Sequence, residues 1–157
     1  MRASRGAGAA RGLVAILSLL PAACVVIDNG PTDPFGREPF VEGFWTIDAF
    51  VQASSCQLVR NEDFEARVFQ NRDILQIVVE VQGFGEVRYD GFLDSDGDFT
   101  VSHSTVFPRL ATRDDATVDG TFDRDGRTLF ATEEEVVTDL LTGQRCSVLW
   151  RWRGSRR

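Results

Sequence analysis

The sequence predicts an all-β domain, an antiparallel up-and-down meander of about eight strands that closes into a small barrel. Apolar residues recur at every second position from Gly43 onward, which is the period of a half-buried strand. Short turns rich in Gly, Asp and Asn separate these segments, as in a chain of hairpins. Eight strands with such short connections close best into a barrel, because closure removes exposed sheet edges.

The first four predicted strands span residues 45–51, 64–70, 74–82 and 87–93. Trp45, Ile47 and Ala49 share one face of the first strand, and the second strand alternates less cleanly. In the third strand Ile77 and Val79 share a face. The break at residues 83–85, a Gly-Phe-Gly sequence, ends this strand and predicts a turn into the fourth.

The other four predicted strands span residues 99–104, 118–122, 129–137 and 146–152. We expect turns at residues 94–98, 123–126 and 141–144, and a polar loop from Pro108 to Asp115. Residues 132–141 are the only competing helix. The β-branched Val136, Val137 and Thr138 favour a strand there.

The first 23 residues have the three parts of a secretory signal. Arg2, Arg5 and Arg11 give a positive start without any acid, residues 13–20 are apolar apart from one serine, and small residues follow. The apolar run is too short to span a bilayer, which takes roughly 20 residues. A buried N-terminal helix is the alternative, but several glycines and Pro21 interrupt its pattern.

Leu20-Pro21-Ala22-Ala23-Cys24 resembles the bacterial lipobox, in which small residues precede a cysteine that is lipidated and becomes the new N-terminus. Pro21 stands where that motif usually has an aliphatic residue. The resemblance implies a lipid anchor on Cys24. Ordinary cleavage nearby, with Cys24 left as a thiol, is the alternative.

Cysteine counting agrees with an anchor, because three cysteines in an exported chain leave one without a disulfide partner. Lipidation of Cys24 leaves Cys56 and Cys146 as a pair, and an oxidising compartment permits a disulfide between them. Such a bridge contributes roughly 4 to 5 kcal/mol in the chain-entropy account. Two buried free thiols are the alternative.

The charge balance excludes one class of partner. The chain carries 24 acidic and 17 basic residues for a net charge of −7, and no acid precedes Cys24, so the exported part is more acidic still. This argues against nucleic acid and against binding of the domain to anionic lipid by charge. Every basic residue apart from one histidine is arginine, which rules out Schiff-base chemistry and the P-loop lysine.

The chain therefore divides into a signal peptide (residues 1–23), a lipidated cysteine with a flexible tether (residues 24–42) and one barrel domain (residues 43–153). Three prolines and two glycines between Val25 and Pro39 prevent regular structure. Val25 follows Cys24, where an aspartate retains lipoproteins at the inner membrane of well-studied Gram-negative bacteria. Its absence favours the outer membrane of the cell envelope.

Gly43-Phe44-Trp45 opens the first predicted strand, and Arg151 and Arg153 lie at the end of the last. This arrangement resembles the Gly-x-Trp signature of lipocalins and their calycin relatives, including avidins. The resemblance implies that Trp45 plugs the closed end of a barrel and that Arg151 or Arg153 packs across its ring in a cation–π contact. The domain is short and has no recognisable C-terminal helix, so it looks more like the compact lipocalin-like domains of bacterial lipoproteins. In the alternative, Trp45 is an ordinary core residue of another small β sandwich.

Two motifs suggest chemistry, and each has a simpler interpretation. Asp94-Ser95-Asp96-Gly97-Asp98 carries three carboxylates, as a calcium loop does, but lacks the EF-hand spacing and is typical of a hairpin turn. His103 is the only histidine, and its alternation with Phe99 and Val101 places it on the inner face. It is either a general base or, as we favour, a core or cavity histidine without a metal partner.

Two acidic runs are interpreted as solvated. Glu133-Glu134-Glu135 places two carboxylates on one face of a strand and marks a solvated stretch or strand end. Asp114-Asp115 falls in the predicted polar loop. We predict no catalytic residue, no metal site and no cofactor.

The sequence thus favours an envelope lipoprotein whose barrel binds a small apolar molecule, by analogy with the fold alone. An interaction or inhibitor-type lipoprotein, with a filled barrel that binds another envelope protein, is the alternative. An enzyme is less favoured, because the chain has one histidine, no lysine and no nucleophile motif. A cavity would favour the first hypothesis and a filled barrel the second.

Overall fold

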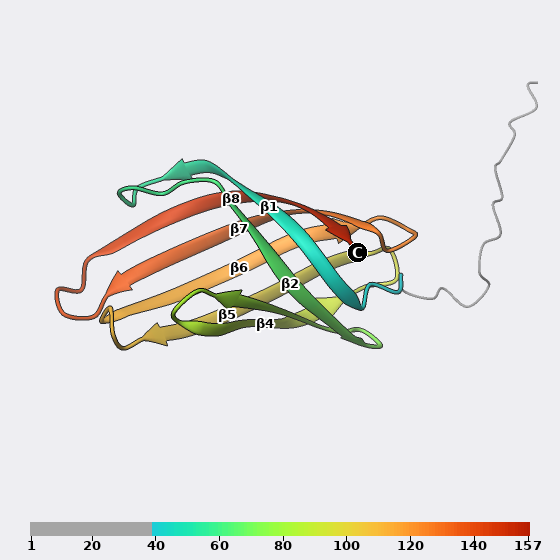
Figure 1. The fold of residues 1–157 in the computed structure, drawn as a ribbon, viewed down its shortest axis with the longest axis horizontal. Coiled ribbons are helices and arrows are strands. Elements are labelled where there is room, and N and C mark those ends of the chain that lie inside the picture. Colours follow the sequence, from blue (N-terminus) through green and yellow to red (C-terminus); the bar gives the residue numbers. More distant parts are fainter. Residues whose placement is uncertain (1–38) are drawn as a thin grey trace, which may run out of the picture. The chain divides into compact units, whose positions relative to one another are not determined.

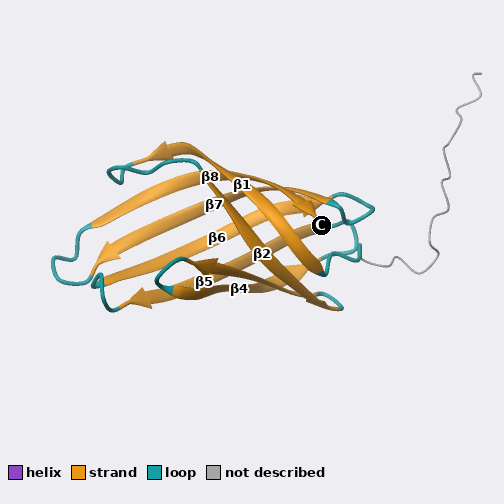
Figure 2. Ribbon diagram, in the orientation of Figure 1, coloured by secondary structure: helices purple, strands orange, loops and turns teal. Residues whose placement is uncertain are grey.

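A computed structural model of the chain describes residues 39–157. The predicted signal peptide, Cys24 and the tether as far as residue 38 lie outside the described residues. The described part consists of strands and connecting loops only (Figure 2). The strands are β1 (Gly43–Ser54), β2 (Glu62–Asn71), β3 (Ile74–Val81), β4 (Gly85–Leu93), β5 (Asp98–Phe107), β6 (Thr112–Phe122), β7 (Thr128–Asp139) and β8 (Arg145–Arg156).

The eight strands form one closed antiparallel barrel in sequence order, which confirms the predicted fold class (Figure 1). Each strand pairs with the next along the chain, and β8 returns to pair with β1, with Trp45 opposite Arg156. The predicted strand at residues 129–137 is β7, so the competing helix does not form. The predicted polar loop is shorter than expected, because β6 already begins at Thr112.

One end of the barrel is closed by packed side chains. Trp45 is fully buried there, and its ring meets the edge of Phe122 with centroids 5.2 Å apart. Phe122 in turn packs against Phe99 at 4.7 Å. The indole Nε1 of Trp45 donates a hydrogen bond of 2.9 Å to the carbonyl of Val41, a residue that is itself fully buried. The chain that leads into β1 therefore covers this end.

The arginine beside this end is Arg156, not Arg151 or Arg153. Arg151 and Arg153 are exposed, because they alternate with Trp150 and Trp152, which point inward. The predicted contact of Arg151 or Arg153 with Trp45 is therefore replaced by a different arrangement.

The Arg156 guanidinium donates to the Phe40 carbonyl at 2.7 Å and lies 5.7 Å from the centroid of the Phe40 ring. Gly43 lies next to its side chain. A Cβ at Gly43 would lie 3.4 Å from Cδ of Arg156, and the φ angle of +145° disfavours a side chain there.

Candidate functional site

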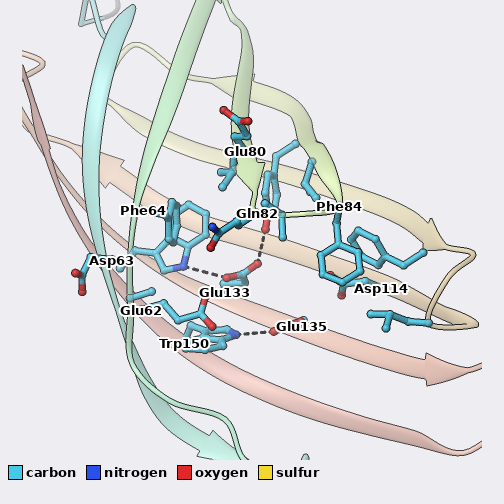
Figure 3. A pocket seen from close by; sticks show the side chains of 18 residues that line it. Glu62, Asp63, Phe64, Glu80, Gln82, Phe84, Asp114, Glu133, Glu135 and Trp150 are labelled. Carbon is cyan, nitrogen blue, oxygen red and sulfur yellow. Dashed lines mark hydrogen bonds between the residues drawn. The ribbon is translucent and has the colours of Figure 1, made fainter.

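The other end of the barrel holds a cavity of about 670 Å³. It lies where β2 and β4 begin and where β3 and β5 end, which is the end opposite Trp45. Aromatic side chains form much of its wall, and most of them come from strands far apart in sequence (Figure 3). They are Phe64, Phe84, Tyr89, Phe107, Trp150 and Trp152.

The polar part of the wall is acidic. Six carboxylates line the cavity, and no arginine or histidine of residues 39–157 does. Glu133, Glu135 and Asp114 lie within the barrel, whereas Asp63 and Glu80 lie at the edge of the group (Figure 3). The sixth carboxylate is Glu62. The wall therefore combines aromatic surface with negative charge.

Glu133 is the most buried of these acids, with 6% of its surface exposed. It points inward because it continues the alternation of Leu129 and Ala131 along β7. The Tyr89 hydroxyl donates to its Oε1 at 2.8 Å, and the indole Nε1 of Trp152 donates to its Oε2 at 3.0 Å. Both carboxylate oxygens are thus satisfied by donors from β4 and β8, as a buried carboxylate requires.

Glu135 follows two positions later on the same inner face, nearer the cavity mouth. The indole Nε1 of Trp150 donates to its Oε2 at 2.7 Å. The Glu134 side chain between them is exposed on the outer face. The pairs Trp152–Glu133 and Trp150–Glu135 therefore form two parallel rungs between β8 and β7.

Asp114 enters the cavity from β6 and is less well satisfied. Its Oδ1 is buried and has no hydrogen-bond partner among residues 39–157. Its Oδ2 lies 3.7 Å from Nε2 of His103, which is too long for a hydrogen bond. His103 is buried, lies 3.2 Å from the Thr105 hydroxyl through Nδ1, and packs edge-on against Tyr89.

Burial raises the pKa of these carboxyl groups. Loss of solvent raises the pKa of Glu133 to about 8, and the charges of Glu135 and Asp114 add to this, although the bonds from Tyr89 and Trp152 oppose it. Burial raises the pKa of Asp114 to about 7, with further contributions from Glu135 and Asp115.

The pKa of Glu135 is also raised, chiefly by burial, with a smaller contribution from the charge of Glu62. Burial lowers the pKa of His103, which keeps its imidazole neutral. Near neutral pH Asp114 and Glu133 are therefore partly protonated, beside an uncharged histidine.

A short hairpin forms one side of the cavity mouth. The β4–β5 ladder runs only from Asp90–Ser102 to Leu93–Phe99, so the start of β4 and the end of β5 are not paired with each other. Pairing of β2 with β3 ends at Ala66–Val79. The hairpin tip (residues 80–87) is therefore unpaired on both flanks, and the edge contact of Phe84 with Phe107, at 5.6 Å, spans the gap to β5.

The structure brings together one predicted pair. Cys56 and Cys146 form a disulfide with a Cα–Cα distance of 5.0 Å, which ties the start of β8 to the loop after β1.

The predicted turns at residues 94–98 and 123–126 are present. The Asp94 carboxylate accepts from the backbone N–H of Asp96 and Asp98, and the Asp123 carboxylate from that of Thr128.

The prediction that the two acidic runs are solvated is wrong for three of their carboxylates. Glu133 and Glu135 lie inside the barrel, and Asp114 is part of β6 rather than of a loop. The alternation of Leu129 and Ala131 carried the signal for Glu133 and Glu135, because the same phase continues through them. Ala116 and Val118 follow Asp114 in the same phase along β6, so extending their alternation backwards predicts an inward Asp114 as well.

Two further features bear on the class of site. Within residues 39–157 no group of three or more His, Cys, Asp or Glu side chains is placed to hold a metal ion. The same part of the chain contains no helix long and apolar enough to cross a membrane.

The closed antiparallel barrel of eight strands is consistent with a calycin-like barrel. No model of a known protein family matches the sequence, and a comparison with curated proteins gave no match.

Proposed function

We propose that this chain is an exported lipoprotein, anchored to the bacterial outer membrane through Cys24, whose lipocalin-like barrel binds a small, largely apolar molecule. The cavity of about 670 Å³ carries the proposal. Its volume lies in the range of roughly 300 to 1,000 Å³ that is usual for small-molecule sites. Aromatic walls with a few convergent polar groups are the usual lining of such sites.

The position of the cavity supports the same function. A barrel that served only as a scaffold would bury its own side chains at both ends, as this one does around Trp45. At the other end the hairpin tip (residues 80–87) leaves the wall open on its flanks. A ligand can therefore enter the cavity beside Trp150 without unfolding of the barrel.

Binding of a neutral fluorescent probe tests the proposal. N-phenyl-1-naphthylamine should bind with one-to-one saturation and accept energy transfer from Trp150. Replacing two lining residues together, Val81→Trp and Leu110→Trp, should weaken binding several-fold by filling the mouth. The matched pair Val106→Trp and Leu140→Trp, at exposed positions outside the lining, should bind as wild type does.

Two results would count against the proposal. Absence of saturable binding would leave the cavity without a ligand-binding role. Equal binding by the filled variant and its matched control would place the probe elsewhere on the surface.

The anchor rests on the signal-like first 23 residues and on Cys24. Cys24→Ser should abolish acylation and leave uncleaved precursor, while the barrel folds as before. Intact-mass measurement of the membrane form checks this. A wild-type mass without acyl chains would refute the anchor and leave the binding proposal standing.

An interaction lipoprotein is the second candidate, and exposed aromatic residues on the outer wall favour it. Phe44 and Phe69 are exposed on β1 and β2, and the Arg67 guanidinium lies over both rings, at 5.1 and 5.8 Å. Exposed aromatic and arginine side chains are enriched at protein interfaces. This candidate becomes the better one if the probe does not bind in the cavity.

A further inference from the structure

The cavity wall has many hydrogen-bond acceptors and few free donors. The indole N–H groups of Trp150 and Trp152 and the hydroxyl of Tyr89 already donate to Glu135 and Glu133. Gln82 supplies the remaining side-chain amide of the lining. A ligand that fits this wall must therefore bring donors of its own, because unpaired buried acceptors cost free energy.

Asp114 shows where such a donor is missing. Its side chain is 16% exposed, and the buried Oδ1 has no hydrogen-bond partner among residues 39–157. The nearest basic group is His103, whose Nε2 lies 3.7 Å from the other oxygen and whose pKa burial lowers. The protein itself therefore supplies no counter-charge to this carboxylate.

The aromatic wall suits a cation as well as an apolar body. The faces of aromatic rings attract ammonium groups, by about 2 kcal/mol when the contact is desolvated. Phe64, Phe84, Phe107 and Trp150 contribute rings to the cavity that the carboxylates share. An anionic ligand, by contrast, would meet four of the six lining carboxylates, since Asp63 and Glu80 are exposed at the edge. It would meet no lining arginine or histidine from the described residues.

We propose that the ligand is an organic cation, a protonated amine on an apolar body, whose ammonium group binds Asp114 and Glu135 while its hydrocarbon lies along the aromatic wall. This inference rests on the proposed ligand-binding function and names the chemical class of the ligand. The Oδ1 atom of Asp114 is itself buried, so the ammonium group approaches the 16% of the Asp114 side chain that is exposed. The charge of the ammonium group offsets the mutual repulsion of the carboxylates.

Protons should be exchanged when such a ligand binds. Asp114 faces His103 from β5, Tyr89 from β4 and Glu133 and Glu135 from β7, with Asp115 beside it on β6. Near neutral pH the raised pKa values leave Asp114 and Glu133 partly protonated.

A bound ammonium favours the ionised carboxylates, so binding should release protons near pH 7. Affinity should therefore rise from pH 6 to pH 8. Glu62, at the mouth beside Glu135, adds to the negative potential.

A matched ligand series tests the inference by calorimetry on the folded barrel at pH 8. Decylamine and 1-decanol share one ten-carbon chain and differ only in the head group, and decanoate has the same number of carbon atoms with one of them in its carboxylate. Decylamine should bind at least about tenfold more tightly than 1-decanol. Decanoate should bind more weakly than either.

Three variants test which carboxylates bind the ammonium group of the ligand. Asp114→Asn and Glu135→Gln should each reduce the preference for the amine several-fold while leaving 1-decanol binding unchanged. Glu134→Gln removes the same charge from the outer face of the same strand and should leave the preference intact. Near-ultraviolet circular dichroism shows whether each variant retains the wild-type packing.

The outcomes separate this inference from the proposed function. If 1-decanol or decanoate binds as tightly as decylamine, the cation inference fails and ligand binding stands. If the amine preference survives in both Asp114→Asn and Glu135→Gln, these carboxylates do not recognise the charge and the inference is overturned. If none of the three compounds binds, the proposed function fails as well.

Discussion

At the scale of the residue, the main feature is a set of buried carboxyl groups whose partners come from other strands. Glu133 has donors for both oxygens, Glu135 has one donor from Trp150, and Asp114 has an oxygen without a partner among the described residues. Burial of these groups costs free energy when they are ionised, and this makes stability depend on pH.

Glu133→Gln should flatten that dependence. In the folded protein the pKa of Glu133 is about 8, against an ordinary value of 4.5, so the folded state holds a proton that the unfolded state has lost between these values. The free energy of unfolding should therefore fall as pH rises through this window. The slope is on the order of 1 kcal/mol per pH unit.

The contribution of Glu133 to the slope is best separated from those of other groups between pH 7 and 8. The raised pKa of Asp114 is about 7, and the pKa of His103 is lowered from its ordinary 6.5. A glutamine at position 133 can accept from Trp152 and donate to Tyr89, so the fold should persist. Urea unfolding at several pH values measures the slope, with Glu134→Gln as control. Equal slopes for wild type and Glu133→Gln would contradict the buried, protonated glutamate.

Trp45 should matter for stability, and Arg151 and Arg153 should not. Trp45→Ala removes a fully buried ring and its bond to Val41, at a typical cost of about 3 to 5 kcal/mol. Arg151→Ala and Arg153→Ala change exposed positions and should stay within about 0.5 kcal/mol. Each should add to Trp45→Ala without coupling. Denaturant unfolding of the single and double variants checks this, and a Trp45→Ala protein as stable as wild type would refute the closed end.

Along each strand, the alternation of inward and outward residues made the strands predictable. The acidic residues that follow the same alternation were misinterpreted. The strands followed from the period of two and from turns such as Asp94 to Asp98. The same period places Glu133 and Glu135 inside and Arg151 outside, but their charge suggested the opposite interpretation for the glutamates. Trp150 and Trp152 meet these glutamates through the pairing of β7 with β8, whereas Tyr89 on β4 reaches Glu133 only across the interior of the barrel.

The disulfide acts on the ends of elements rather than on the barrel wall. Cys56 lies in the loop after β1 and Cys146 near the start of β8, next to the ladder that closes the barrel. Replacing both with alanine should lower the free energy of unfolding by roughly 2 to 5 kcal/mol. Labelling of free thiols in native, unreduced protein gives an independent check. High-yield labelling of either cysteine would contradict the bridge.

The end of β5 (residues 103–107) should be less protected from hydrogen exchange than the fully paired part of the barrel wall. The end of β5 has no partner strand on its β4 side, whereas β7 pairs along its length with both β6 and β8. Backbone amides in 103–107 that face the gap should exchange with solvent faster than those of Leu129 to Glu135. Hydrogen exchange by mass spectrometry measures this. Equal protection of the two segments would mean that the gap is closed in solution.

At the scale of the whole molecule, the barrel has one packed end and one open end. Closure could be predicted from eight alternating segments with short turns, because a closed meander leaves no edge. The cavity could not be predicted from the sequence. It depends on how far inward side chains fill the interior and on where the hairpin tip (residues 80–87) loses its pairing with the neighbouring strands. Asp114 lies beside His103 and Glu135 through the pairing of β6 with β5 and β7, but its enclosure in a cavity depends on the whole barrel.

The three tryptophans permit the most direct test of ligand binding in the open end. The chain has three indole N–H groups, two of which lie at the cavity, on Trp150 and Trp152, and donate to Glu135 and Glu133. The third belongs to Trp45 at the closed end and donates to Val41. In a ¹⁵N–¹H spectrum these three signals report on the two ends of the same barrel.

Titration with N-phenyl-1-naphthylamine should shift the indole signals of Trp150 and Trp152 together, with saturation at one equivalent. The Trp45 signal should stay in place, because its end of the barrel is packed. Three unmoved signals at saturating probe, or a Trp45 signal that moves as far as the other two, would contradict a ligand site at the open end.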